Sequence, residues 1–249
     1  MLHRRRLARG LARVAGSDDP IGLRIADALR AALGHRLEPP ELEWVERIEA
    51  LRRALESSTE ELVEITAEGQ PSKRGVAELT RIGSVSPQWA LVLFMLVRRL
   101  EPASCLELGT CLGISAAYQG AALELNGSGR LVTLEAGHAR AAVAERKLTG
   151  LGVHRVTVRV GRFQDTLEST LREFAPIEYA FVDGHHERDA TIRYFAHLVS
   201  HAVEDAVLVF DDITWSQGMR DAWATIRMDR RVKLWTEATR FGICVVRGA

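Results

Sequence analysis

The stretch from Cys105 to Tyr118 constrains the fold of this chain more than any other. It begins as an apolar run that ends in Glu107-x-Gly109, passes a second glycine at Gly113 and continues into an alanine-rich segment. This order predicts a strand, a tight turn and the start of a helix, where α/β proteins bind nucleotide-like ligands. Glycine at position 109 lets the backbone turn sharply or approach a ligand, and Gly113 is expected to bring the helix close to the strand. A turn that needs glycine for packing alone is the competing interpretation.

Short apolar segments alternate with amphipathic ones from residue 103 onward. Strands are expected near 103–108, 130–136, 154–160, 177–183 and 206–211, and helices near 113–125, 138–150, 164–174, 187–201 and 217–228. This alternation predicts a parallel sheet joined by right-handed crossovers, with helices on both faces. Residues 232–236 and 241–246 have no helix between them, so they are expected to form an antiparallel hairpin.

The first hundred residues have helical periodicity, and no convincing strand is found there. Apolar side chains recur with a helical period over 20–33 and 41–55, and a helix is expected from about 88 to 100. Residues 69–83 are polar and contain Gly and Pro, which predicts a loop. Residues 1–84 are therefore predicted to be a helical N-terminal extension, acting as a lid or an oligomerisation region, before a domain over 85–249.

Composition excludes several function classes. The chain has 33 basic and 33 acidic residues, so no overall field attracts it to nucleic acid or membranes. The longest apolar run, 89–97, is far too short to span a bilayer. Three widely spaced cysteines fit a reducing cytoplasm. The arginine-rich start is read as a surface helix or a solvated tail, with a basic membrane- or RNA-contacting helix as the alternative, and no function is assigned to it.

The Glu107-x-Gly109-x-x-x-Gly113 pattern resembles the first motif of the class I S-adenosylmethionine-dependent methyltransferases. Cys111 stands where a dinucleotide fingerprint has its middle glycine. The resemblance covers roughly residues 85–247. It implies an α/β fold with a doubly wound, mostly parallel, seven-stranded sheet of the Rossmann-like methyltransferase type, whose last strand is antiparallel.

The same resemblance implies a binding site for S-adenosylmethionine. Glu135 closes the second strand, where a carboxylate can accept hydrogen bonds from both ribose hydroxyls. Residues 161–165 read G-x-x-Q-D, similar to the turn that lines the adenine in catechol O-methyltransferase-like enzymes. Gln164 offers a donor and an acceptor to the base, whereas Phe163 packs either on the base or in the core. The predicted cofactor-binding set is Glu107, Gly109, Thr110, Gly113, Ser115, Glu135, Ala136, Gly161, Phe163, Gln164 and Asp183.

Three aspartates are expected to converge at the same rim of the sheet. Asp183 closes the fourth strand, and Asp211 and Asp212 close the fifth. Crowded carboxylates repel one another unless a cation neutralises them, and oxygen ligands suit Mg²⁺, Ca²⁺ or Mn²⁺. The arrangement is similar to that of metal-dependent O-methyltransferases of the catechol type, which implies a divalent cation, Mg²⁺ first, held by these residues. Capping of the next helices is the competing interpretation.

The acceptor side of the site is less sharply defined. His186 stands three residues after Asp183, where the catechol enzymes have a lysine that acts as general base, so Asp183 and His186 are the catalytic candidates. His185 is the second candidate base, facing solvent or the metal. The substrate pocket is expected to include His185, Trp215, Met219 and Arg220, with the segment 71–86 closing over it. Trp215 as a packing residue for the last helix is the alternative.

These residues together predict divalent-metal-dependent O-methylation of a small hydroxylated molecule, such as a phenol, a catechol or a sugar hydroxyl. The resemblance extends to bacterial catechol-type and macrolide-sugar O-methyltransferases. Two alternatives stay open: an NAD(P)-dependent oxidoreductase on a related fold, and a non-catalytic subunit of the same fold whose N-terminal helices dock a partner. No nucleic-acid partner and no membrane span are expected, and a homodimer is compatible with the sequence.

Overall fold

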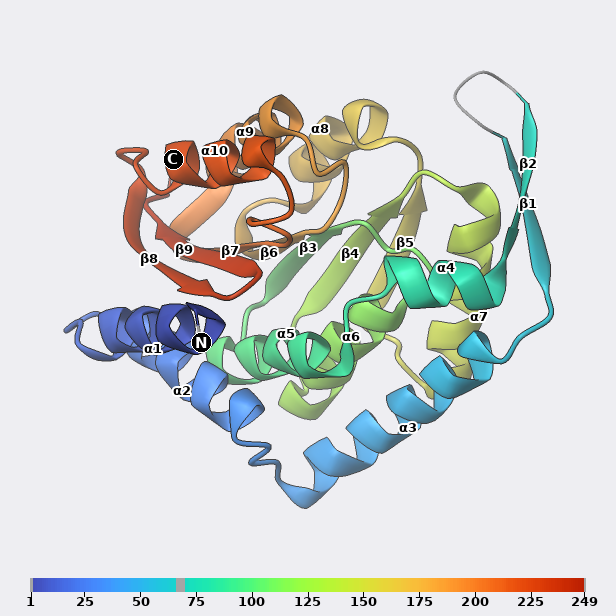
Figure 1. The fold of residues 1–249 in the computed structure, drawn as a ribbon, viewed down its shortest axis with the longest axis horizontal. Coiled ribbons are helices and arrows are strands. Elements are labelled where there is room, and N and C mark those ends of the chain that lie inside the picture. The colour runs from blue at the N-terminus through green and yellow to red at the C-terminus, as the bar shows by residue number, and fades with distance from the viewer. Residues whose placement is uncertain (1, 66–69, 249) are drawn as a thin grey trace.

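The computed structural model describes residues 2–65 and 70–248, with side chains from Leu7 onward. Position 69, where the predicted loop begins, and the side chains of Arg4, Arg5 and Arg6 lie outside this description. The described residues form a central sheet between two helical layers (Figure 1).

The sheet has seven strands in the order β5-β4-β3-β6-β7-β9-β8. Five parallel strands are β3 (Ser104–Leu108), β4 (Arg130–Glu135), β5 (Val156–Val160), β6 (Ile177–Val182) and β7 (Ala202–Phe210). The last strand, β9 (Phe241–Val246), runs antiparallel to β7 and to the edge strand β8 (Val232–Ala238). The predicted fold class and terminal hairpin are therefore confirmed.

Both faces of the sheet are buried because apolar side chains point alternately to either side. In β3, Cys105 joins the core under one helical layer, and Leu106 and Leu108 join the core under the other. The first layer contains α5 (Pro87–Leu100), α6 (Ile114–Asn126) and α7 (His138–Leu151). The second contains α8 (Phe163–Phe174), α9 (Arg188–Val199) and α10 (Gln217–Ile226).

The N-terminal helices extend the first layer. Helix α1 (Leu2–Ala15) contacts β8, α2 (Pro20–Leu33) packs on α5, and α3 (Pro39–Glu56) packs on α6 (Figure 1). Their apolar residues Ile25, Leu29 and Ile48 are fully buried in the same core as α5 and α6. The predicted N-terminal extension thus shares its core with the sheet.

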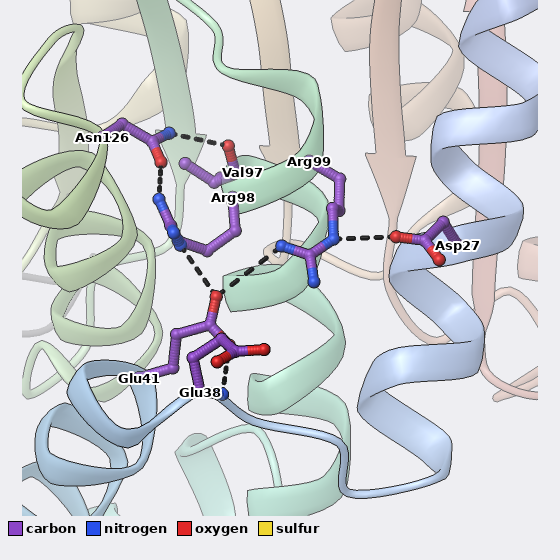
Figure 2. Close-up of polar contacts among 7 residues, drawn as sticks. All are labelled: Asp27, Glu38, Glu41, Val97, Arg98, Arg99 and Asn126. Atoms are coloured by element: carbon purple, nitrogen blue, oxygen red, sulfur yellow. Dashed lines mark hydrogen bonds and ion pairs between the residues drawn. The ribbon is translucent and has the colours of Figure 1, made fainter.

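A polar network ties α2 and α3 to α5 and α6 (Figure 2). Glu41 of α3 is 1% exposed and accepts from Arg98 of α5 at 3.0 Å, with Arg99 of α5 at 3.6 Å. Arg99 also pairs with Asp27 of α2 at 2.8 Å, and Arg98 donates to Asn126 at the end of α6. A buried carboxylate needs such partners, so this network fixes α2 and α3 against the layer.

The segment between α3 and α5 differs from the prediction. A β-hairpin of β1 (Glu61–Ile65) and β2 (Pro71–Gly75), followed by α4 (Val76–Gly83), replaces the expected loop, and the prediction of no strand before residue 100 was wrong. Strand β2 reads Pro-Ser-Lys-Arg-Gly, so it has no apolar alternation that would reveal it. Its stability comes from antiparallel pairing with β1, a non-local contact that local patterning does not report.

Across the described part of the chain, no individual helix has the length and apolar character needed to cross a bilayer; α4 and α5 meet that test only as a pair bent by 67°.

Candidate functional site

A cavity of about 1180 Å³ opens at the carboxyl ends of the parallel strands. The turn after β3, the end of β4 and the loops after β6 and β7 supply one part of its wall. Strand β1 and the segment 81–86 supply the opposite part. Of the segment 71–86, residues 81–86 line the cavity, whereas 71–75 is a strand and not a loop, and closure of the segment over the site stays a prediction.

The structure divides the predicted cofactor-binding set in two. The residues that line the cavity are Gly109, Glu135, Ala136, Phe163, Gln164 and Asp183. The residues that do not line it are Glu107, Thr110, Gly113, Ser115 and Gly161. Glu107, Thr110 and Ser115 of the second group are buried side chains.

The two motif glycines allow neighbouring elements of the fold to approach their backbone closely. Gly109 has φ +113°, and a Cβ there would lie 2.0 Å from the carbonyl oxygen of Asp183, so only glycine fits between the ends of β3 and β6. Gly113 has φ +88°, and its Cβ would lie 3.1 Å from Ala144 of α7. Gly113 therefore brings α6 against α7, whereas the sequence suggested an approach to the strand.

Glu107 lies in the sheet interior, fully buried. Its carboxylate accepts from Nε2 of Gln119 at 2.7 Å and from Oγ1 of Thr133 at 2.5 Å. Burial raises the pKa of Glu107 from 4.5 to about 7, although these hydrogen bonds oppose the rise. Glu107 thus supports the glycine turn from below.

Glu135 presents a fixed carboxylate to the cavity. Oε2 accepts from the backbone N–H of Cys111 at 2.8 Å, and Oε1 accepts from that of Gly137 at 2.8 Å. Nη2 of Arg140 lies 3.0 Å from Oε1, and Nε of Arg140 donates to Glu64 of β1 at 2.9 Å. An ionised carboxylate has about four lone-pair sites, so Glu135 keeps acceptor capacity for a ligand.

Arg140 and Glu64 were missed at the level of sequence. Arg140 stands in the first turns of an ordinary amphipathic helix, and Glu64 lies in a strand that was not predicted. Their contact joins residues 76 positions apart, so no local pattern reports it.

The aromatic part of the wall is tightly packed. Phe163 is 9% exposed, and its ring makes edge contacts with His185 and Tyr194 at centroid distances of 5.8 and 5.7 Å. Phe163 therefore belongs to the core and still lines the cavity. Nδ1 of His185 lies 2.5 Å from the hydroxyl of Tyr194, and His185 is exposed and lines the cavity.

The three predicted aspartates meet at the rim, and Arg240 lies among them. Nε and Nη2 of Arg240 contact the two carboxylate oxygens of Asp211 at 2.5 and 2.7 Å. Nη2 also lies 2.9 Å from Oδ1 of Asp212. Burial, followed by the charge of Asp211, raises the pKa of Asp183 well above its usual range, and burial raises that of Asp211 to about 6.

The structure does not show the predicted metal site. Within residues 2–65 and 70–248, no group of three or more His, Cys, Asp or Glu side chains is placed to hold a metal ion. Among these carboxylates lies a cation of the protein itself, because Arg240 contacts both oxygens of Asp211 and one oxygen of Asp212. Sequence reasoning missed Arg240 because it lies 28 residues beyond Asp212, in the turn between β8 and β9.

Of the remaining predicted residues, His186 and Trp215 line the cavity, whereas Met219 and Arg220 do not. Nε2 of His186 lies 3.6 Å from Oδ1 of Asp183, and burial lowers the pKa of His186 below 6.5. Trp215 lines the cavity and is 73% exposed. Met219 is buried against Thr191, and Arg220 is exposed and donates to the carbonyl of Thr214. Both were predicted to belong to the substrate pocket, but neither lines the cavity.

Sequence comparison relates this chain to methyltransferases. Residues 106–213 match a family model described as a methyltransferase domain. A catechol O-methyltransferase from Niastella koreensis is 31% identical over 132 residues, which are 52% of this chain. The match covers 58% of that relative's length.

Solved structures share the fold. An O-methyltransferase from Bacillus cereus in complex with SAH superposes with a TM-score of 0.60 at 22% identity, over 91% of this chain and 100% of the other. TomG from Streptomyces achromogenes, an O-methyltransferase of tomaymycin synthesis in complex with SAM, gives 0.57 at 22% identity over 100% of both chains. Residues 106–213 are therefore similar to a methyltransferase domain, and the chain resembles S-adenosylmethionine-dependent O-methyltransferases in this part of its sequence and shares their fold.

Proposed function

We propose that the chain transfers a methyl group from S-adenosylmethionine to a hydroxyl oxygen of a small molecule in this cavity. The observation that carries the proposal is the carboxylate of Glu135, held by two backbone N–H groups at the wall of a cavity of about 1180 Å³. A fixed carboxylate at the end of the strand beside a glycine turn is suited to a ribose diol. The SAH- and SAM-bound neighbours support the same assignment of the cofactor.

The residues of the wall fit an adenosyl group. Glu135 would accept from the ribose hydroxyls, and Gln164 would pair with the adenine edge. Phe163, packed against His185 and Tyr194, offers the base a rigid apolar surface. S-adenosylmethionine, when bound, supplies an electrophilic methyl group on a sulfonium.

The acceptor side of the cavity favours an aromatic molecule. Val63, Ile65, Ile82 and Trp215 line it and are 54%, 69%, 66% and 73% exposed. Exposed apolar side chains gathered at one mouth indicate a surface that a ligand covers. We infer that a phenol or catechol fits this mouth better than a sugar hydroxyl does, which agrees with the catechol O-methyltransferase relative. The hairpin β1–β2 and α4 would then act as the lid expected of the N-terminal extension.

His186 is the best-placed proton acceptor. Burial lowers its pKa and so keeps the imidazole neutral near pH 7, and the negative charge of Asp212 favours the charged ring that forms on proton uptake. The acceptor's O–H proton would pass to His186 as the acceptor oxygen takes up the methyl group, and S-adenosylmethionine would supply that group and keep the electrons of the broken S–CH₃ bond. Alignment of donor and acceptor supplies most of the remaining rate enhancement.

The residues present do not fit the divalent cation that the sequence predicted. Arg240 contacts both oxygens of Asp211 and one of Asp212, so a guanidinium already neutralises the carboxylates that a Mg²⁺ ion would have to share. No step of the proposed reaction therefore depends on a metal.

Calorimetric titration of S-adenosylhomocysteine tests the proposal. We expect micromolar binding by the wild-type chain and at least about tenfold weaker binding by Glu135→Gln, because the ribose would lose charge-assisted hydrogen bonds. Glu145→Gln, an exposed change on α7, is the matched control and should bind as the wild type does. Binding of NADH in place of S-adenosylhomocysteine would support an oxidoreductase instead. Binding of neither would favour a non-catalytic subunit.

A further inference from the structure

The acidic rim of the cavity contains a positively charged side chain of the protein itself, that of Arg240. Three carboxylates, Asp183, Asp211 and Asp212, meet where β6 and β7 end. The guanidinium of Arg240 contacts Asp211 through two nitrogens and Asp212 through one of these. Two parallel N–H···O contacts to one carboxylate fix the plane of a guanidinium.

The fold also fixes the backbone of Arg240. Its carbonyl accepts from the N–H of Ile213 at 3.1 Å, directly after the acidic pair. Gly242, two residues later, is paired with Phe210 in the register of β9 and β7. The hairpin turn is therefore held beside the end of β7, and Arg240 is a built part of the rim.

The edge of the guanidinium that bears Nη1 is available to a ligand in the cavity. Arg240 lines the cavity and its side chain is 29% exposed, whereas Asp211 is buried. Nε and Nη2 make the contacts to the aspartates, and Nη1 has no partner among the described residues. An arginine donor that is fixed in place and still has free N–H groups can meet an oxygen entering the cavity.

We propose that Arg240 is the resident cation of the acceptor site, standing where the sequence predicted a divalent metal, and that Nη1 stabilises the acceptor oxygen as its proton leaves. This inference rests on the proposed methyl transfer. Guanidinium and metal would compete for the same carboxylate oxygens, and arginine keeps its charge at every accessible pH. The chain therefore does not take up a divalent ion at this rim while Arg240 is in place.

Binding of Mn²⁺ alone, followed by electron paramagnetic resonance of the free ion, tests this exclusion without any substrate. We expect no stoichiometric binding by the wild type at millimolar Mn²⁺. Arg240→Ala should gain one site, because three crowded carboxylates lose their cation, and Arg240→Ala combined with Asp211→Asn should lose that site again. Arg172→Ala removes an exposed arginine of α8 that pairs with Glu168 and should behave as the wild type.

Two results of this titration would overturn the proposal. One is a stoichiometric Mn²⁺ site in the wild type that Asp211→Asn abolishes. The other is a folded Arg240→Ala chain that binds no Mn²⁺. The wild-type titration decides the first point even where Arg240→Ala fails to fold.

Turnover assays distinguish a failure of the role proposed for Arg240 from a failure of the proposed methyl transfer. With a phenolic acceptor, we expect wild-type turnover to persist in EDTA. Arg240→Ala should lower kcat by about 10²–10³ with a smaller change in KM, as expected when a fixed charge-stabilising donor is lost. Arg240→Lys should recover part of kcat, since it keeps the charge and loses the bidentate geometry. Abolition of wild-type turnover by EDTA overturns the role of Arg240 and leaves methyl transfer intact, whereas failure to bind S-adenosylhomocysteine overturns the proposed function itself.

Discussion

Replacement of the buried Glu107 by glutamine should change how the stability of the fold depends on pH. Burial raises the pKa of this carboxyl from 4.5 to about 7. Between these values the folded chain binds a proton that the unfolded chain has released, so the free energy of unfolding falls as the pH rises through this window. The shift corresponds to about 3 kcal/mol, lost at about 1.4 kcal/mol per pH unit.

The assay is urea unfolding followed by tryptophan fluorescence from pH 4.5 to 8. Glu107→Gln carries no titrating proton, so the stability of the variant relative to the wild type should rise by about 3 kcal/mol across this range. Any constant offset from altered contacts to Thr133 and Gln119 does not affect this slope. Glu46→Gln, an exposed change on α3, is the control and should follow the wild-type curve. Parallel curves for Glu107→Gln and the wild type would refute the reasoning.

Three further substitutions test the cavity wall. His186→Gln should lower kcat by about 10²–10⁴ and abolish the fall in activity at acid pH. In the wild type this fall should begin below pH 6.5, because burial lowers the pKa of His186. A fall at acid pH that survives in the variant contradicts the role of His186 as base. Trp215→Ala should raise KM for an aromatic acceptor about tenfold and leave stability within about 0.5 kcal/mol, since the side chain is 73% exposed; an unchanged KM argues against its place in the acceptor site. Glu64→Gln should speed amide hydrogen exchange of β1 by releasing Arg140, whereas Lys73→Gln, which breaks only the exposed pair with Glu61, should not; equal exchange in both variants would show that the link to Arg140 does not hold the hairpin.

Much of the fold could be predicted because the relevant signals are local. The apolar strands, the amphipathic helices between them and the glycine turn at Gly109 each lie within a few residues of one another. Strand β2 could not be predicted in this way, since its polar sequence is stabilised by pairing with β1.

The site was predicted best where strand ends determine it. Glu135, Asp183, Asp211 and Asp212 follow directly from the parallel topology, which gathers these strand ends at one rim. Arg240 reaches that rim through the register of β9 against β7, and no sequence spacing reports such a register. Three carboxylates imply a cation, but they do not determine whether it is a metal or a guanidinium.

A crystal structure with S-adenosylhomocysteine tests the central claim most directly. We predict density for the nucleoside in the cavity of about 1180 Å³, with the ribose hydroxyls on Glu135 and the base against Phe163 and Gln164. Density elsewhere on the chain, or a ribose that does not contact Glu135, would contradict the account.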